Sequence, residues 1–204
     1  MNHHRLPVAL LCFTLAAFLL LGWHPRADRF TWFMENVPVI LGVPVLVLTH
    51  KRFPLTTLLY VLIALHSLVL MMGGHWTYAE VPAGHWVKGW LHLARNPYDR
   101  LGHLFQGFMP VLLFREVLFR KGILKPGAWS VVVLTFMVLG LSAAYELLEW
   151  QTAVWTGSSA DAFLGTQGDP WDTQWDMACA LIGASLGLAS LSGLQDREMK
   201  SLPH

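Results

Sequence analysis

Residues 128–150 read AWSVVVLTFMVLGLSAAYELLEW, and this stretch decides the fold because a long apolar run ends in two glutamates. A helix that crosses the hydrocarbon core of a bilayer needs about 20 mostly apolar residues, and the stretch supplies them. Charged side chains near membrane depth are costly and are candidates for function, which directs attention to Glu146 and Glu149. The stretch therefore predicts a membrane-spanning helix with functional carboxylates near one end.

Five more stretches satisfy the same length and hydropathy requirement. They cover residues 6–23, 32–49, 54–72, 101–119 and 176–194. The first is longer than the 7–15 residues of a typical signal-peptide core, so we expect an uncleaved helix there. Together the six stretches predict an all-α fold, a polytopic membrane bundle of six transmembrane helices that forms one domain over residues 1–204.

The composition excludes several classes of protein. Only 13% of the residues are charged and 54% are apolar or aromatic, whereas a soluble domain carries roughly 25% charged residues. This balance excludes a disordered chain. The net charge of +1 and the lack of a basic stripe argue against a nucleic-acid partner. Two cysteines, each in an apolar run, exclude a disulfide scaffold. The lipid bilayer is the expected partner.

The placement of the charges predicts an orientation. With the N-terminus inside, nine of the 14 Lys and Arg residues fall on the cytoplasmic side, which favours cytoplasmic termini. Ten of the 13 acids and nine of the 10 tryptophans then fall on the outer side. Outer loops are expected at residues 73–100 and 151–175. The chain is therefore expected to work at the outer face of the membrane.

Polar side chains stand at the outer ends of three predicted helices. They are Asp99, His103, Gln106, Tyr145, Glu146, Glu149, Asp172 and Asp176. Side chains four residues apart share a helix face, as Asp99 and His103 do. Because the topology brings all three helix ends to one surface, we expect these side chains to converge.

Small residues continue the face of Asp176 into the membrane. Ala180, Gly183 and Gly187 follow it at helical spacing, and such a stripe lets a second helix approach closely. Asp176 is therefore expected to face the interior of the bundle. Gly140 and Ala144 predict a similar packing surface in the helix at 128–150.

Three segments resemble one bacterial family. NPYDRLGHLFQGFMPVLLFRE (96–116), YELLEWQTAVWTG (145–157) and ADAFLGTQGDPWDTQWDM (160–177) look like the hallmarks of uncharacterised inner-membrane proteins of the YjdF type. More distantly, the chain resembles the VanZ-like membrane proteins. Asp99 and His103 match the first element of that pattern. Glu146 or Glu149 with Gln151 matches the second, and Asp176, Gly183 and Gly187 match the third. The resemblance implies an inner-membrane location, and neither family implies a settled activity.

Histidine and carboxylates together suit a divalent metal ion. The candidate ligands are Asp99, His103, Glu146, Glu149 and Asp176, and we expect His103, Glu149 and Glu146 to be the catalytic groups. His75 and His85 are further candidate ligands from the loop. Structural roles compete with this hypothesis: Asp99 and Asp172 as helix N-caps, Glu146 and Glu149 as partners of Arg95 or Arg100, and His66 bonded to a neighbour.

A ligand at the outer face would meet polar and aromatic side chains of the same helix ends and loops. The predicted substrate-binding residues are Gln106, Tyr145, Trp150, Trp171 and Gln174. The ligand is expected to be a lipid-linked or other small molecule at headgroup level.

Three functions remain open on this evidence. The first is a metal-assisted enzyme that acts on a lipid-linked or envelope substrate. The second is a small transporter or channel for protons, cations or a solute, with Glu146, Glu149 and Asp176 as an acidic mouth. The third is a non-catalytic membrane scaffold whose outer loops dock a partner.

Overall fold

The computed structural model describes residues 5–156 and 166–202, and within these ranges the chain is all-helical. The elements are α1 (Arg5–Trp23), α2 (Arg29–Glu35), α3 (Val37–Thr49), α4 (Thr57–Trp76), the 3-10 helix η1 (Tyr78–Glu80), α5 (Pro82–Leu91), α6 (Tyr98–Arg120), α7 (Ala128–Thr156) and α9 (Asp172–Met199). The predicted all-α class is confirmed. The predicted loop at 73–100 contains η1 and α5, and part of the loop at 151–175 lies outside the described residues.

Four helices are long and apolar enough to cross a membrane, namely α1, α4, α7 and α9. The pair α2 and α3 makes a fifth candidate span, bent by 45°. The remaining predicted span, residues 101–119, corresponds to α6. This helix carries charges at both ends and does not meet the same requirement of length and hydropathy.

The bend between α2 and α3 breaks the helix that the sequence predicted over residues 32–49. Pro38 occupies the second position of α3 and has no N–H to continue the hydrogen bonds of a preceding helix. The Asn36 side chain donates instead to the Trp32 carbonyl oxygen over 2.7 Å. As a result, α2 and α3 meet at an angle, and Glu35 at the end of α2 is buried.

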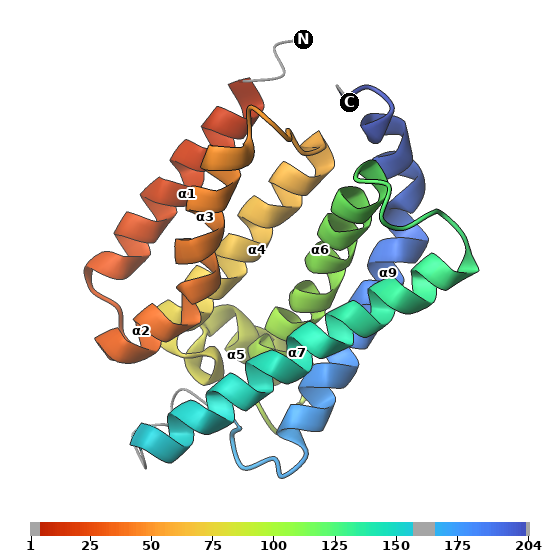
Figure 1. Ribbon diagram of the computed structural model, residues 1–204. Coiled ribbons are helices and arrows are strands. Elements are labelled where there is room, and N and C mark those ends of the chain that lie inside the picture. The colour runs from red at the N-terminus through yellow and green to blue at the C-terminus, as the bar shows by residue number, and fades with distance from the viewer. Residues whose placement is uncertain (1–4, 157–165, 203–204) are drawn as a thin grey trace.

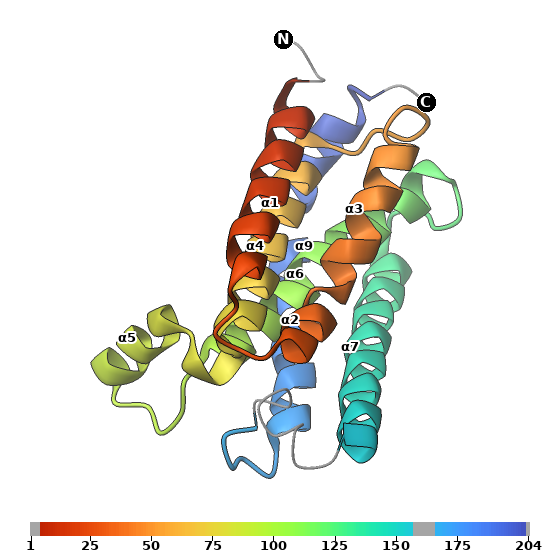
Figure 2. The same cartoon turned by 90° about the vertical axis from the view of Figure 1, so that its left-hand side faces the viewer.

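Figures 1 and 2 show the helices as one bundle in which α1 begins and α9 ends at the same end. α6 begins, α7 ends and α9 begins at the opposite end, called the site end below. α1, α2 and α3 pack on α4, while α7 packs on α6 and α9. The topology therefore brings the three polar helix ends together, as the sequence predicted.

α6 and α9 share the largest helix–helix contact of the described chain. A Cβ added at Gly107 would meet the Ala180 backbone, and one added at Gly183 would meet the Leu104 backbone. The predicted small-residue stripe on α9 is thus confirmed, with α6 as its partner. Gly140 on α7 has nothing within 4 Å of an added Cβ, so the packing surface predicted for Gly140 and Ala144 is wrong at Gly140.

A buried polar network fixes the end of the bundle opposite the site end. Glu116 is fully buried and accepts hydrogen bonds from the backbone N and hydroxyl of Thr56, at 2.9 and 2.7 Å. Arg120 donates to Glu116 over 3.0 Å, and Gln195 donates to it over 3.3 Å. The network joins the start of α4 to α6 and α9.

Candidate functional site

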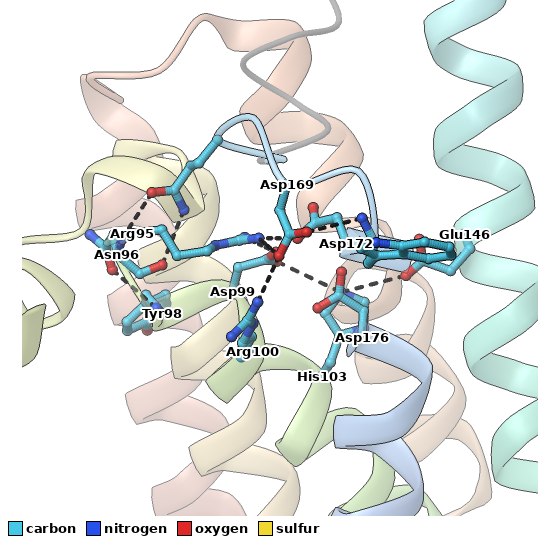
Figure 3. A network of polar contacts seen from close by, with 12 residues as sticks. Arg95, Asn96, Tyr98, Asp99, Arg100, His103, Glu146, Asp169, Asp172 and Asp176 are labelled. Carbon is cyan, nitrogen blue, oxygen red and sulfur yellow. Dashed lines mark hydrogen bonds and ion pairs between the residues drawn. The ribbon is translucent and has the colours of Figure 1, made fainter. Parts of the chain in front are cut away.

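His103 stands at the centre of the site end, where its ring is buried and its two nitrogens have different surroundings (Figure 3). Nδ1 lies 3.0 Å from the Gln106 Oε1 atom. Because a carboxamide oxygen can only accept, Nδ1 carries a proton, which in the neutral ring leaves Nε2 with a lone pair. Helical spacing brings Gln106 beside His103 on α6.

The Nε2 atom of His103 faces three carboxyl groups from three helices. Nε2 lies 3.7 Å from Asp99 Oδ1, 3.7 Å from Glu146 Oε1 on α7 and 4.0 Å from Asp176 Oδ2 on α9. All four residues are buried. Acceptor groups so arranged repel one another unless a proton or a metal cation lies among them.

Two of these carboxyl groups have an oxygen without a hydrogen-bond partner. Within the described chain, Asp176 Oδ1 and Glu146 Oε1 are buried and accept no hydrogen bond. Buried polar atoms are normally satisfied, because an unsatisfied one costs about 1–3 kcal/mol. An ordered water, a shared proton or a bound cation would satisfy these two atoms.

Ligand atoms of Asp99, His103 and Asp176 lie within 4.8 Å of one another, which is the arrangement of a candidate metal site. Tetrahedral ligands at 2.0–2.2 Å from a zinc ion are roughly 3.4 Å apart. The 3.7 and 4.0 Å separations at His103 need only a small contraction to reach that geometry. The residues present thus fit a divalent cation, with Glu146 in reach as a fourth group.

Two arginines balance part of the negative charge around this group. Arg95 pairs with Asp99 over 3.2 Å and also with Asp172, and Arg100 pairs with Asp169 over 2.9 Å. Burial alone would lower the pKa of Arg95, but the hydrogen bond and charge of Asp172 raise it above its ordinary value. The guanidinium therefore stays charged and holds the Asp99 carboxylate.

The segment that carries Arg95 is fastened by the fully buried Asn96. The Asn96 side chain donates to the Val81 carbonyl oxygen and accepts from the Tyr98 backbone N. Its backbone N and O pair with the Gln167 side chain at 2.9 and 3.0 Å. The start of α6 is thereby tied to the turn before α9, and Asp99 and Asp172 are held at fixed positions around Arg95.

A cavity of about 780 Å³ begins beside the site. Its polar end includes Asp99, His103 and Glu149, together with Glu35 at the end of α2. The Tyr145 hydroxyl donates to Glu35 over 3.4 Å. Burial and the charge of Glu35 raise the pKa of the Tyr78 phenol well above its ordinary value, so this second hydroxyl stays protonated beside Glu35.

The structure brings together four of the five predicted metal ligands: Asp99, His103, Glu146 and Asp176. Glu149 also lines the cavity, but within the described residues it forms no ion pair with His103. Of the three predicted catalytic groups, His103 and Glu146 are adjacent, while Glu149 lines the cavity without an ion pair to His103 in the described chain.

The predicted substrate-binding residues divide in the same way. Gln106 and Tyr145 line the cavity. Trp150, Trp171 and Gln174 are exposed and do not line it. Their predicted contact with a ligand has no support from this arrangement and stays a prediction.

Several structural roles expected from the sequence are wrong. Asp99 and Asp172 are not N-caps, because Pro97 and Trp171 occupy those positions and both carboxylates bind Arg95. Arg95 and Arg100 pair with aspartates, so they are not the partners expected for Glu146 and Glu149.

Two further candidate ligands, His75 and His85, are elsewhere engaged, and His66 lies apart from them. His75 bonds the Leu21 carbonyl oxygen and His85 pairs with Glu80, so neither contributes to the His103 group. His66 is buried on the cavity wall, and its Nε2 atom has no hydrogen-bond partner within the described residues. The expected hydrogen bond from His66 to a neighbour is therefore not made by Nε2 within the described residues.

Sequence reasoning missed the roles of Arg95, Asn96 and Glu35. Arg95 precedes Asp99 by four residues, and that helical spacing was the available signal for their ion pair. Nothing in the local sequence connects Asn96 with Gln167. Glu35 lies in a predicted span, where an acidic residue is itself a signal for function.

Comparisons with known proteins agree on the class of protein. Residues 6–197 match a family described as "Predicted membrane protein (DUF2238)". The chain is 47% identical over 187 residues to "Inner membrane protein YjdF" of Escherichia coli (strain K12), which covers 92% of this chain and 90% of the relative. No solved structure matches the chain. The resemblance to inner-membrane proteins of the YjdF type is confirmed, and the more distant one to VanZ-like proteins stays a prediction.

Proposed function

The chain belongs to the DUF2238 family of predicted membrane proteins, and on that premise we propose that it is a metal-assisted enzyme of the inner membrane. Its substrate is a lipid-linked or envelope molecule reached from the outer face. The observation that carries this proposal is the pair of buried carboxylate oxygens of Asp176 and Glu146 that lack a hydrogen-bond partner and lie around His103.

Asp99, His103 and Asp176 would hold the cation, with Glu146 as a further ligand or as the proton acceptor. A bound divalent cation lowers the pKa of a coordinated water and polarises a phosphoryl or carbonyl oxygen. Gln106 keeps the proton on Nδ1 of His103, so that Nε2 stays available as a ligand. Arg95 pairs with the Asp99 carboxylate and would hold it in position.

The proposal includes six membrane crossings in one domain, with both termini in the cytoplasm. α6 would be the sixth span, because it lies between α4, α7 and α9 and its charged residues have partners inside the bundle. The excess of Lys and Arg at the end opposite the site supports this orientation. The site end would then face outward.

Elemental analysis of detergent-purified protein tests the metal. We expect about one divalent ion per chain in the wild-type protein. In Asp176→Asn we expect the metal affinity to fall by more than the 10- to 100-fold that removal of an outer-shell partner costs. Glu80→Gln is the matched control, because Glu80 is exposed and pairs with His85 outside the His103 group. Wild-type protein that stays metal-free in the presence of added zinc or manganese would refute the metal centre.

A transporter is the second candidate, because the cavity extends from His103 as far as Arg52 and Lys121 at the opposite end. Its middle section offers few polar side chains, among them His66 and Ser67, which argues against an ion path. Ion or proton flux in liposomes that Glu146→Gln abolishes would favour transport over catalysis.

A further inference from the structure

The cavity beside His103 is long as well as large. α3, α4, α6 and α7 form its walls, and on α6 its lining runs from Asp99 to Lys121. At 1.5 Å per residue these positions are roughly 33 Å apart along the helix. This length is about the full hydrocarbon thickness of a bilayer, or twice the depth of one leaflet.

The lining changes in character along this length. At the site end it includes the acidic and tyrosine side chains described above, and at the opposite end Arg52 and Lys121. Between the two ends most of the wall is aliphatic or aromatic, as at Leu113, Phe114 and Leu118. Such a cavity fits a ligand with one polar end and a long hydrocarbon chain.

The cavity also reaches the lipid-facing surface of the bundle. Val45 on α3 and Met137 and Leu141 on α7 line it, yet these side chains are 57%, 37% and 38% exposed. These residues come from two of the helices that wall the cavity, α3 and α7. A membrane lipid could therefore enter sideways between them without leaving the bilayer.

From these observations we infer that the cavity holds the hydrocarbon chain of a membrane amphiphile whose head group lies at His103, and that this chain extends past the middle of the bilayer. The inference rests on the proposed function, because it places the head group at the metal centre. It narrows the substrate class to amphiphiles with a chain longer than one leaflet is deep.

Gly42 offers a way to close the cavity halfway. It lines the cavity on α3, seven residues from both Glu35 and Thr49, and a Cβ there meets nothing within 4 Å. Gly42→Phe therefore adds a ring to open space without a backbone clash. Gly140→Phe is the matched control, because Gly140 also has open space but does not line the cavity.

The experiment uses hexadecyl phosphate with a photoreactive diazirine at the end of its chain, and the octyl analogue. Val117 lies roughly 21 Å beyond His103 along α6, within reach of the longer chain alone. In wild-type protein and Gly140→Phe, reconstituted in nanodiscs, we expect the long probe to label Leu113 and Val117, and the short probe to label Gln106 or Met109.

In Gly42→Phe we expect labelling of Val117 to fall about tenfold, because the added ring would compete with the hydrocarbon chain for the same space. The free energy typical of an over-filled site corresponds to about a tenfold change in binding. Labelling by the octyl probe should persist. Excess unlabelled hexadecyl phosphate should suppress labelling of the cavity. If Val117 labelling persists in Gly42→Phe, or if the long probe labels only lipid-facing residues such as Phe136, the inference is wrong.

Metal content measured on the same preparations separates this inference from the proposed function. Metal-replete protein with no labelling inside the cavity would overturn the inference of a lipid cavity without contradicting the metal centre. Metal-free protein with chain-length-dependent labelling at Val117 would overturn the metal centre and keep the lipid cavity.

Discussion

At the scale of single residues, the site depends on how the two nitrogens of one imidazole are assigned. Gln106 determines which nitrogen of His103 carries the proton, and the three carboxyl groups determine what the other nitrogen faces. Each contact comes from a different helix turn or a different helix. A shift of any of these helices would therefore change the surroundings of the His103 side chain.

Gln106→Leu should lower divalent-metal affinity about 10- to 100-fold, because the substitution removes the group that orients a ligating histidine. Gln174→Leu, on the exposed start of α9, should leave the affinity unchanged. Competition with a fluorescent zinc chelator measures both constants. Equal metal affinities in the two variants would show that Gln106 does not contribute to the metal site.

Glu116→Ala should destabilise the bundle by about 3–5 kcal/mol, because it leaves the buried partners of Glu116 without their carboxylate. Unfolding in mixed detergent micelles measures the change in free energy. Glu80→Ala, which removes an exposed carboxylate, should change it by less than about 0.5 kcal/mol. A similar stability for the two variants would show that the network contributes little.

At the scale of elements, the crossing of α6 and α9 determines the site geometry. The backbones approach closely because Gly107, Gly183 and Gly187 have no side chains to separate them. His103 lies on one helix of this pair and Asp176 on the other, so any widening of the crossing also moves the two residues apart.

Gly183→Val should therefore destabilise the protein by about 1–3 kcal/mol and weaken metal binding together, because its side chain would strike the Leu104 backbone. Gly193→Val lies on the same helix in open space and provides the matched control. Thermal unfolding and metal titration of both variants test this. Full metal affinity in Gly183→Val would show that the crossing does not position the ligands.

At the scale of the whole molecule, the two ends of the bundle differ in chemistry. The site end gathers buried acids and two arginines, and the other end gathers Lys and Arg with one buried glutamate. α5 projects from the site end with Trp86 and Trp90 largely exposed (Figure 2). Exposed tryptophans favour the membrane–water interface, which fits a site at headgroup depth.

Cysteine labelling tests the orientation of the molecule. In a Cys12→Ser, Cys179→Ser background, a membrane-impermeant maleimide added to spheroplasts should label Glu80→Cys at the site end. It should label Lys125→Cys only after the membrane is permeabilised. Both positions are exposed at opposite ends of the bundle. The reverse pattern would place the site in the cytoplasm.

The sequence alone determined the membrane class, the approximate bounds of the long helices and the convergence of Asp99, His103 and Asp176. These features follow from short-range rules, namely the length of apolar runs, helical spacing and alternation of helix direction. The stripe of Gly183 and Gly187 even indicated which side of α9 faces a neighbour, because small residues mark a close helix crossing.

Tertiary structure decided which of two nearby glutamates joins His103. Glu146 and Glu149 are one turn apart on α7, and only the rotation of that helix against α6 and α9 places Glu146 at the imidazole. The break at Asn36, which buries Glu35, and the pairing of Arg95 with Asp172 likewise join distant segments. Such contacts depend on how whole helices pack, and no local pattern of residues encodes them.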